Sequence, residues 1–277
     1  MCSKIFYAFP RFFLYVRRSI GLIGAVVCLI AAPGLFAGGK SERQAAAPAD
    51  QKLVVVASTS WVAAIARAGG AENIRILAPV ELKHPPEYEL KPSDLTAVSK
   101  ADMILYAGWE MFAEKLAETA GSAKVQLVQV NTSNNPEDLK TEARKLAERF
   151  GTLDRFEAWS RDFDRLTAEL RPQILAAYPD KRAVVQRMQT PFAVWLGLDI
   201  IGEYGPAEPS AAVILELVQL HPALIIDNYH GPSGQPIAEA ANAPYAELLN
   251  FPGKDGTQSI EDLFRYNADV LIHAAAR

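Results

Sequence analysis

Two series of short apolar runs, each alternating with segments of helical spacing, limit the fold more than any other feature of this sequence. The runs of the first series lie at residues 53–58, 74–80, 103–107 and 125–130, and those of the second at 183–188, 199–204, 223–227 and 245–250. The first run, at 53–58, is almost entirely apolar, which is typical of a strand buried on both faces. Such strands separated by helices predict mainly parallel sheets covered by helices. We therefore expect an α/β fold.

The middle of the chain, residues 134–180, has a different pattern and divides the two series. Asn135 can cap a helix whose first position is Pro136, and apolar residues then recur at helical spacing as far as Tyr178, with an interruption at Gly151. We expect a long backbone helix that joins two α/β lobes, at 52–133 and 181–277. An ordinary helical hairpin is the alternative.

The first 37 residues have the composition of an export signal. They contain four basic residues and no acid, and the apolar stretch Ile20–Ala32 is short for a span of about 20 residues. We interpret 1–37 as a signal peptide and 38–51 as a flexible tether, and we expect a periplasmic or other extracytoplasmic location. A retained membrane anchor, or a lipid attached at Cys28, is the alternative.

Composition excludes several classes of function for the mature chain. Both cysteines, Cys2 and Cys28, lie in the leader, so disulfides, thiolate metal sites and cysteine nucleophiles are absent from the rest. The mature chain keeps 24 basic and 32 acidic residues, a net charge of about −8, which argues against nucleic-acid binding. Phosphate-binding glycine motifs are missing, and the sequence at 231–234 is not a serine-hydrolase elbow. We therefore do not expect this protein to be an enzyme.

A metal site without cysteine needs histidine and carboxylate ligands. The chain has four histidines, of which His221 and His273 stand near helix ends and suit the helix dipole there. His84 and His230 each follow a predicted strand, and Asp227 ends the apolar run before His230. Because ligands of open α/β sheets gather at the carboxyl ends of strands, these three residues are candidate metal ligands.

Several segments, in the right order, resemble the metal-binding solute receptors of ABC importers for zinc and manganese. They are the strand and turn Val54–Trp61, the motif Glu87–Leu95, the strand and helix across 101–116, the helix Ala207–Val218 and the terminal helix Ser259–Leu271. The resemblance implies two α/β lobes, a rigid connecting helix, and capture of a ligand between the lobes. It also implies an ABC permease as partner, and we expect the receptor to be a monomer.

The positions of that family's metal ligands carry other residues here. The first histidine's place is Pro86, the next two fall at Asn131 and Gln189, and the last carboxylate falls at Asn250. A neutral amide is a poor ligand for zinc, because its oxygen supplies neither charge nor nitrogen.

Two hypotheses follow for the ligand. The first, which we favour at this point because both histidines follow strands, is a transported Zn²⁺ or Mn²⁺ ion held by relocated side chains: His84, Asp227 and His230, with Glu87 or Glu110 beside them. The second is a small polar organic ligand held without metal in a cleft formed by Glu87, Glu110, Asn131, Gln189 and Asn250, with Trp109 or Trp195 as an apolar wall.

Overall fold

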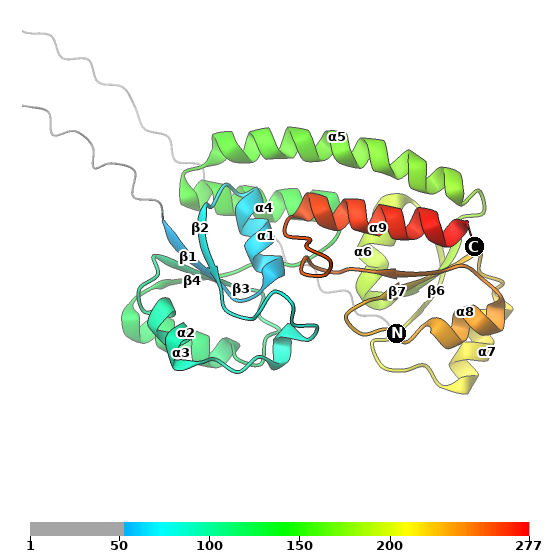
Figure 1. Ribbon diagram of the computed structural model, residues 1–277, viewed down its shortest axis with the longest axis horizontal. Helices are drawn as coiled ribbons and strands as arrows, with labels where there is room; N and C mark the ends of the chain where they lie inside the picture. Colours follow the sequence, from blue (N-terminus) through cyan, green and yellow to red (C-terminus); the bar gives the residue numbers. More distant parts are fainter. Residues whose placement is uncertain (1–52, 277) are drawn as a thin grey trace, which may run out of the picture. The chain divides into compact units, whose positions relative to one another are not determined.

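The computed structural model describes residues 53–276, so the predicted signal peptide (1–37) and tether (38–51) lie outside the described residues. Two sheets of four parallel strands form the framework (Figure 1). The first has the order β2-β1-β3-β4, with β1 Val54–Ala57, β2 Asn73–Ile76, β3 Met103–Tyr106 and β4 Gln126–Gln129. The second has the order β6-β5-β7-β8, with β5 Arg182–Gln186, β6 Asp199–Tyr204, β7 Leu224–Asn228 and β8 Tyr245–Leu248. The predicted α/β class with two lobes is confirmed.

Helices cover the sheets in both lobes. The first lobe contains α1 Ser60–Ala68, α2 Pro92–Val98 and α3 Ala113–Ala123, with the short 3₁₀ turn η1 Pro85–Glu87. The second contains η2 Arg187–Gln189, α6 Thr190–Leu196, α7 Ala211–Gln219, α8 Gln235–Ala241 and α9 Ile260–Ala275. Polar side chains cap the first turns of two of these helices. The Thr59 side chain accepts the backbone N–H of the third residue of α1, and Ser259 and Asp262 form a capping box at α9.

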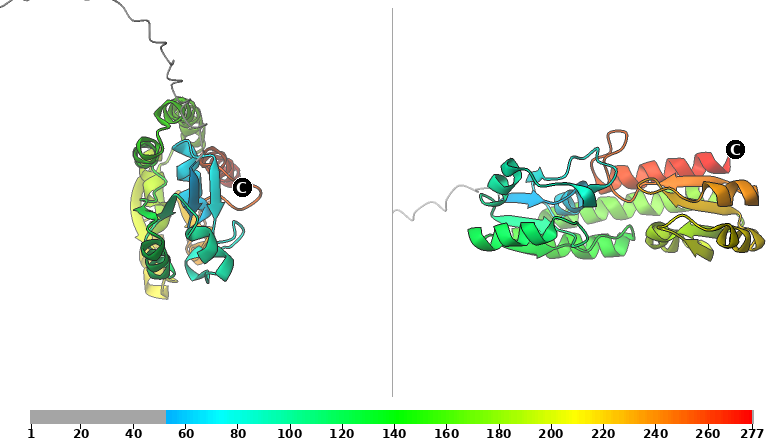
Figure 2. Two further views of the ribbon diagram at one scale, coloured as in Figure 1. Left: turned by 90° about the vertical axis from the view of Figure 1, so that its left-hand side faces the viewer. Right: turned by 90° about the horizontal axis from the view of Figure 1, so that it is seen from below.

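The middle segment consists of two helices, α4 Pro136–Phe150 and α5 Leu153–Ala177. The break falls at Gly151, whose φ of 72° is a left-handed conformation that glycine adopts without steric cost. The 25-residue α5 is the long backbone helix, because it contacts α1 and α4 on one side and α6 and α9 on the other. Figures 1 and 2 show α5 extending along both lobes.

Aromatic packing makes the junction between α5 and the second lobe rigid. On α5, Phe163 stacks on Trp159 with ring centroids 5.0 Å apart, and it meets Phe264 of α9 edge-on at 5.0 Å. Phe192 of α6 completes the cluster at 5.3 Å from Phe264. Each such pair contributes about 0.5–1.5 kcal/mol beyond the burial of apolar area, so this cluster fixes α5 against the second sheet.

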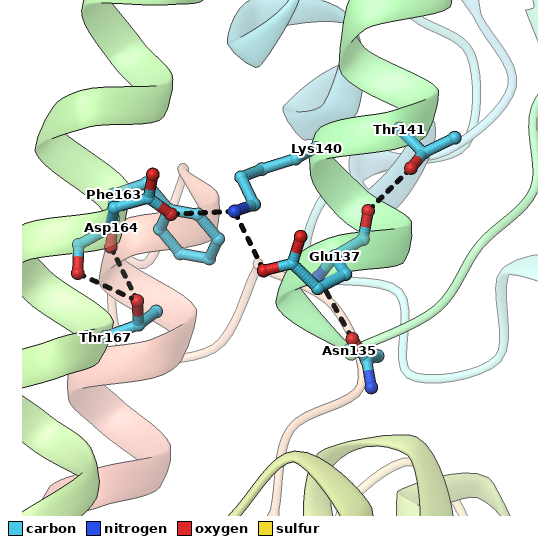
Figure 3. A network of polar contacts seen from close by, with 7 residues as sticks. All are labelled: Asn135, Glu137, Lys140, Thr141, Phe163, Asp164 and Thr167. Carbon is cyan, nitrogen blue, oxygen red and sulfur yellow. Dashed lines mark hydrogen bonds and ion pairs between the residues drawn. The ribbon is translucent and has the colours of Figure 1, made fainter.

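A polar contact joins α4 to α5 (Figure 3). Lys140 of α4 places its Nζ 2.8 Å from a carboxylate oxygen of Asp164 on α5 and 2.8 Å from one of Glu137. Both acids are largely exposed, so solvent screens these pairs and we expect them to stabilise the hairpin by less than about 1 kcal/mol.

The two lobes also touch directly along one side, through the loop that follows β8. The hydroxyl of Ser60 on α1 donates to the carbonyl of Pro252 at 2.7 Å, and Arg67 donates to the carbonyl of Gln258 at 3.2 Å. A Cβ on Gly253 would lie only 2.2 Å from the carbonyl oxygen of Val80, so the backbones of the two lobes are in close contact here. Within residues 53–276, none of the helices combines the length and the apolar character that crossing a membrane requires.

Candidate functional site

A cleft of about 610 Å³ lies where the carboxyl ends of both sheets face each other. Residues at or shortly after the carboxyl end of each described strand contribute to the lining. The main contributions of the first lobe are Trp61, Lys83, His84, Trp109, Thr132 and Asn134. Those of the second lobe are Gln186, Arg187, Met188, Asn228, His230, Asn250 and Phe251. Parallel sheets bind ligands at this edge, because loops from several strands converge there.

The loop that carries His84 into the cleft is held by Asp94, the buried acid of the first motif. Asp94 accepts hydrogen bonds from the Tyr88 hydroxyl at 2.7 Å and from the backbone N–H of Lys91 at 3.0 Å, and it pairs with Arg75 at 3.3 Å. Burial first, and then the hydrogen bond to Asp94, raise the pKa of Tyr88 to about 12. The motif residues thus fix the loop, while His84 remains exposed on the cleft wall.

His230 is buried in the opposite wall in its neutral form. Its ring stacks on Phe251 with centroids 3.6 Å apart, and its Nδ1 accepts the backbone N–H of Asn250 at 3.4 Å. Burial, and then the positive charges of Lys83 and His84, lower the pKa of His230 to about 3. An imidazole whose Nδ1 accepts a hydrogen bond carries its proton on Nε2. Metal coordination through Nε2 would therefore require that hydrogen bond to break.

Asp227 performs a structural task behind the cleft wall. Its side chain is completely buried and accepts the backbone N–H groups of Asn228, Ser233 and Gly234 at 2.8, 2.9 and 2.6 Å. The Tyr245 hydroxyl adds a fourth bond at 2.7 Å. Burial, and then the hydrogen bond to Asp227, raise the pKa of Tyr245 well above its ordinary value. These donors occupy both carboxylate oxygens, so Asp227 holds the 229–234 loop and does not reach the cleft.

The predicted metal ligands are therefore only partly brought together. His84 and His230 line the same cleft from different lobes, whereas Asp227 does not line it. Across residues 53–276, no group of three or more His, Cys, Asp and Glu side chains is arranged to hold a metal ion.

The two glutamates proposed beside the cleft do not line it. Glu87 is exposed on η1. Glu110 is buried and accepts the Ser58 hydroxyl and the backbone N–H groups of Ala107 and Gly108. It therefore orders the turn that follows β3, because a buried carboxylate needs these donors to replace water.

Of the three amides proposed for an organic ligand, Asn250 lines the cleft. Gln189 is buried beneath it and donates to the side-chain oxygen of Asn250 at 2.7 Å, so it orients that amide. Asn131 is exposed and lines a separate groove beside α4. Of the two candidate walls, Trp109 lines the cleft, while Trp195 packs against Phe192 and Phe264 in the core. The apolar wall is thus Trp109, because Trp195 is used in packing.

Several lining residues were missed by the sequence reasoning. Gln186 and Asn228 are the last residues of β5 and β7, and Lys83 and Asn134 lie in the loops beyond β2 and β4. Their position directly after strands was the available signal, since the same rule had selected His84 and Asp227.

This chain has two parallel-sheet lobes, a long helix that joins them and a cleft between them. These features place its fold in the class of two-lobed α/β proteins with a backbone helix. Residues 55–150 match the family model described as ZnuA, the periplasmic zinc-uptake complex component A. Among curated protein sequences, none matches this chain.

Solved structures with the same fold extend the comparison to both lobes. The laminin-binding protein Lbp of Streptococcus pyogenes is 18% identical, with 81% of this chain and 99% of that chain covered and a TM-score of 0.64. The periplasmic zinc-binding protein TroA of Treponema pallidum is 19% identical, with 82% and 100% covered and a TM-score of 0.62. FpvC of Pseudomonas aeruginosa, solved with Mn²⁺, is 17% identical, with 81% and 98% covered and a TM-score of 0.63. The resemblance to metal-binding periplasmic solute-binding proteins is confirmed, in sequence over residues 55–150 and in fold over both lobes.

Proposed function

We propose that this protein is an extracytoplasmic solute receptor that captures its cargo in the cleft and delivers it to an ABC permease. The observation that carries this proposal is the cleft itself, which is formed by loops at the carboxyl ends of both sheets. The match to a periplasmic zinc-uptake family over residues 55–150 supports it. Because α5 is packed against both lobes, capture would involve a small closure and not a wide hinge motion.

A transition-metal ion is the first candidate cargo, because TroA is described as zinc-binding and FpvC was solved with Mn²⁺ and with Ni²⁺. In this chain, His84 and His230 are the side chains on the cleft wall that suit such an ion. With two imidazoles and no carboxylate on the wall, an ion would have to complete its coordination with water or amide oxygens. We therefore expect its affinity to be low compared with a complete histidine and carboxylate set.

The experiment is calorimetric titration of the purified, chelator-treated protein with Zn²⁺, Mn²⁺ and Ni²⁺. Metal cargo predicts one ion per chain, with binding lost in His84→Ala and in His230→Ala and retained in His221→Asn, whose side chain is exposed outside the cleft. Absence of stoichiometric uptake of all three ions would remove the metal hypothesis.

A small polar organic ligand is the second candidate, and the cleft residues favour it. Among the described residues that line the cleft, none is Asp or Glu, whereas amides, aromatic rings and cationic side chains are all present. Its volume of about 610 Å³ lies within the range of about 300–1,000 Å³ typical of small-molecule sites. The receptor function is common to both candidates. The titration above therefore tests which cargo is bound, and it does not test the receptor function itself.

A further inference from the structure

The electrostatic character of the cleft is positive. The cationic side chain Lys83 lines it from the first lobe, and Arg187 lines it from the second. Asp227 and Glu110 are buried acids behind the wall, and each accepts hydrogen bonds from neutral donors there. A site of this kind attracts anions and repels cations.

The walls of the cleft offer flat apolar surfaces. Phe251 stands between His230, on which it stacks, and Trp61 of the first lobe, whose ring centroid lies 5.8 Å away at 32°. Trp109 is held in orientation by its Nε1–H, which donates to the Thr132 hydroxyl at 3.2 Å. Aromatic rings from both lobes therefore line one cavity, which suits a ligand with a flat ring.

Buried polar atoms on the cleft residues have no partner within the described chain. They belong to Asn134 (Nδ2 and Oδ1), Gln186 (Nε2) and Trp61 (Nε1). Asn134 is 1% exposed and Gln186 is 0% exposed, so bulk water does not supply the hydrogen bonds that these side chains lack. An unpaired buried donor is costly to a fold, and a ligand that accepts its hydrogen bond removes that cost. Three of the four atoms are N–H donors, which match an acceptor-rich ligand.

Resting on the proposed receptor function, we propose that the cargo is a small organic anion with a flat ring, such as an aromatic carboxylate, bound without metal. The ring would lie between the aromatic walls formed by Trp61, Phe251 and Trp109. The anionic group would face Lys83 and Arg187, with N–H donors of Asn134 and Gln186 completing its hydrogen bonds. The same residues explain why a bare cation is a poor occupant.

The test is calorimetric titration with benzoate, phenylacetate, indole-3-acetate and nicotinate, each beside its neutral amide, with ZnCl₂ and MnCl₂ as separate arms. We expect at least one carboxylate to bind at one per chain and at least about tenfold more tightly than its amide, a difference of one charged hydrogen bond. That binding should weaken as salt is raised. It should also weaken at least about tenfold in Lys83→Gln/Arg187→Gln and remain unchanged in Lys100→Gln/Lys181→Gln, whose exposed side chains lie outside the cleft.

One variant separates a ligand contact from a structural role. Asn134→Leu removes two unpaired polar atoms, so it should raise the thermal unfolding midpoint of the ligand-free protein while weakening carboxylate binding at least about tenfold. A lowered midpoint, or unchanged binding, would overturn the assignment of Asn134. If an amide or a metal ion binds in the cleft as tightly as any carboxylate, the receptor proposal stands and the anion inference fails. If no carboxylate, amide or metal ion binds, both fail.

Discussion

Acidification should destabilise this protein through His230. The ring is buried and neutral in the folded chain, with a pKa of about 3. An unfolded histidine has a pKa of about 6.5. Between these two values the unfolded chain binds a proton that the folded chain does not, so the free energy of unfolding falls as the pH is lowered. This penalty is absent well above pH 6.5 and grows progressively as the pH falls toward 3.

The size of the effect follows from those two pKa values. At pH 5 the histidine lies 1.5 units below its unfolded pKa and two units above its folded pKa, which corresponds to about 2 kcal/mol. At pH 7.5 the same group contributes close to zero. The groups that face the ring are Lys83 and His84 from the first lobe, and their positive charges add to the effect of burial. Most carboxylates titrate below pH 5, so they change little over this interval.

Urea unfolding at pH 7.5 and pH 5 measures the effect directly. His230→Phe keeps a flat ring against Phe251 but cannot titrate, so its loss of stability on acidification should be about 2 kcal/mol smaller than that of the wild type. His221→Asn is the matched control, because His221 is exposed at a positive φ that asparagine tolerates, and it should lose as much as the wild type. Equal losses in the wild type and His230→Phe would refute the reasoning.

Four further substitutions test the structural roles described above. Asp227→Asn leaves three backbone donors facing an amide, so urea unfolding should show a loss of about 3 kcal/mol. Gly253→Ala should lower the unfolding midpoint, because Gly253 has a φ of 149° and the added Cβ would lie 2.2 Å from the Val80 carbonyl oxygen. Gly121→Ala is the comparison in α3: its Cβ would meet no atom within 4 Å, so it should stabilise the fold by about 0.5–1 kcal/mol. Lys140→Met should change the free energy of unfolding by less than about 1 kcal/mol, and a larger loss would contradict the screening argument.

The fold was predictable because local patterns and global topology agree in this chain. Apolar runs such as 53–58 and 223–227 are buried strands, and parallel pairing follows from the helices between them. The predicted strand at 74–80 ends earlier, at Ile76, although Leu77 and Ala78 still donate backbone hydrogen bonds to the chain at the end of β1. Gly151 marked the break between α4 and α5, but spacing alone could not show that both a hairpin and a long backbone helix are present.

The site was less predictable, because a carboxylate that follows a strand can either face the cleft or accept hydrogen bonds from its own loop. The sequence looks the same in both cases. Asp227 could point into the cleft or bond its own loop, and the outcome depends on the 229–234 segment folding back so that Ser233 and Gly234 present their N–H groups. Glu110 behaves in the same way, because its carboxylate accepts the backbone N–H groups of Ala107 and Gly108 in its own turn. These are tertiary facts about loops, for which residue type and spacing carry little information.

The chemistry of the cleft, rather than the scaffold, determines which cargo this chain can hold. Similarity at 17–19% identity shows the fold of the lobes, and a transition-metal ion in the cleft would be held tightly only if carboxylate or neutral imidazole donors converged on it. Here Lys83 and Arg187 line the cleft, the wall among the described residues lacks Asp and Glu, and the one buried histidine has its Nδ1 engaged by a backbone N–H. Each of these facts raises the free energy of a bound cation, and each except the last lowers that of a bound anion. The proposed cargo therefore rests on the lining of the cleft and not on the scaffold.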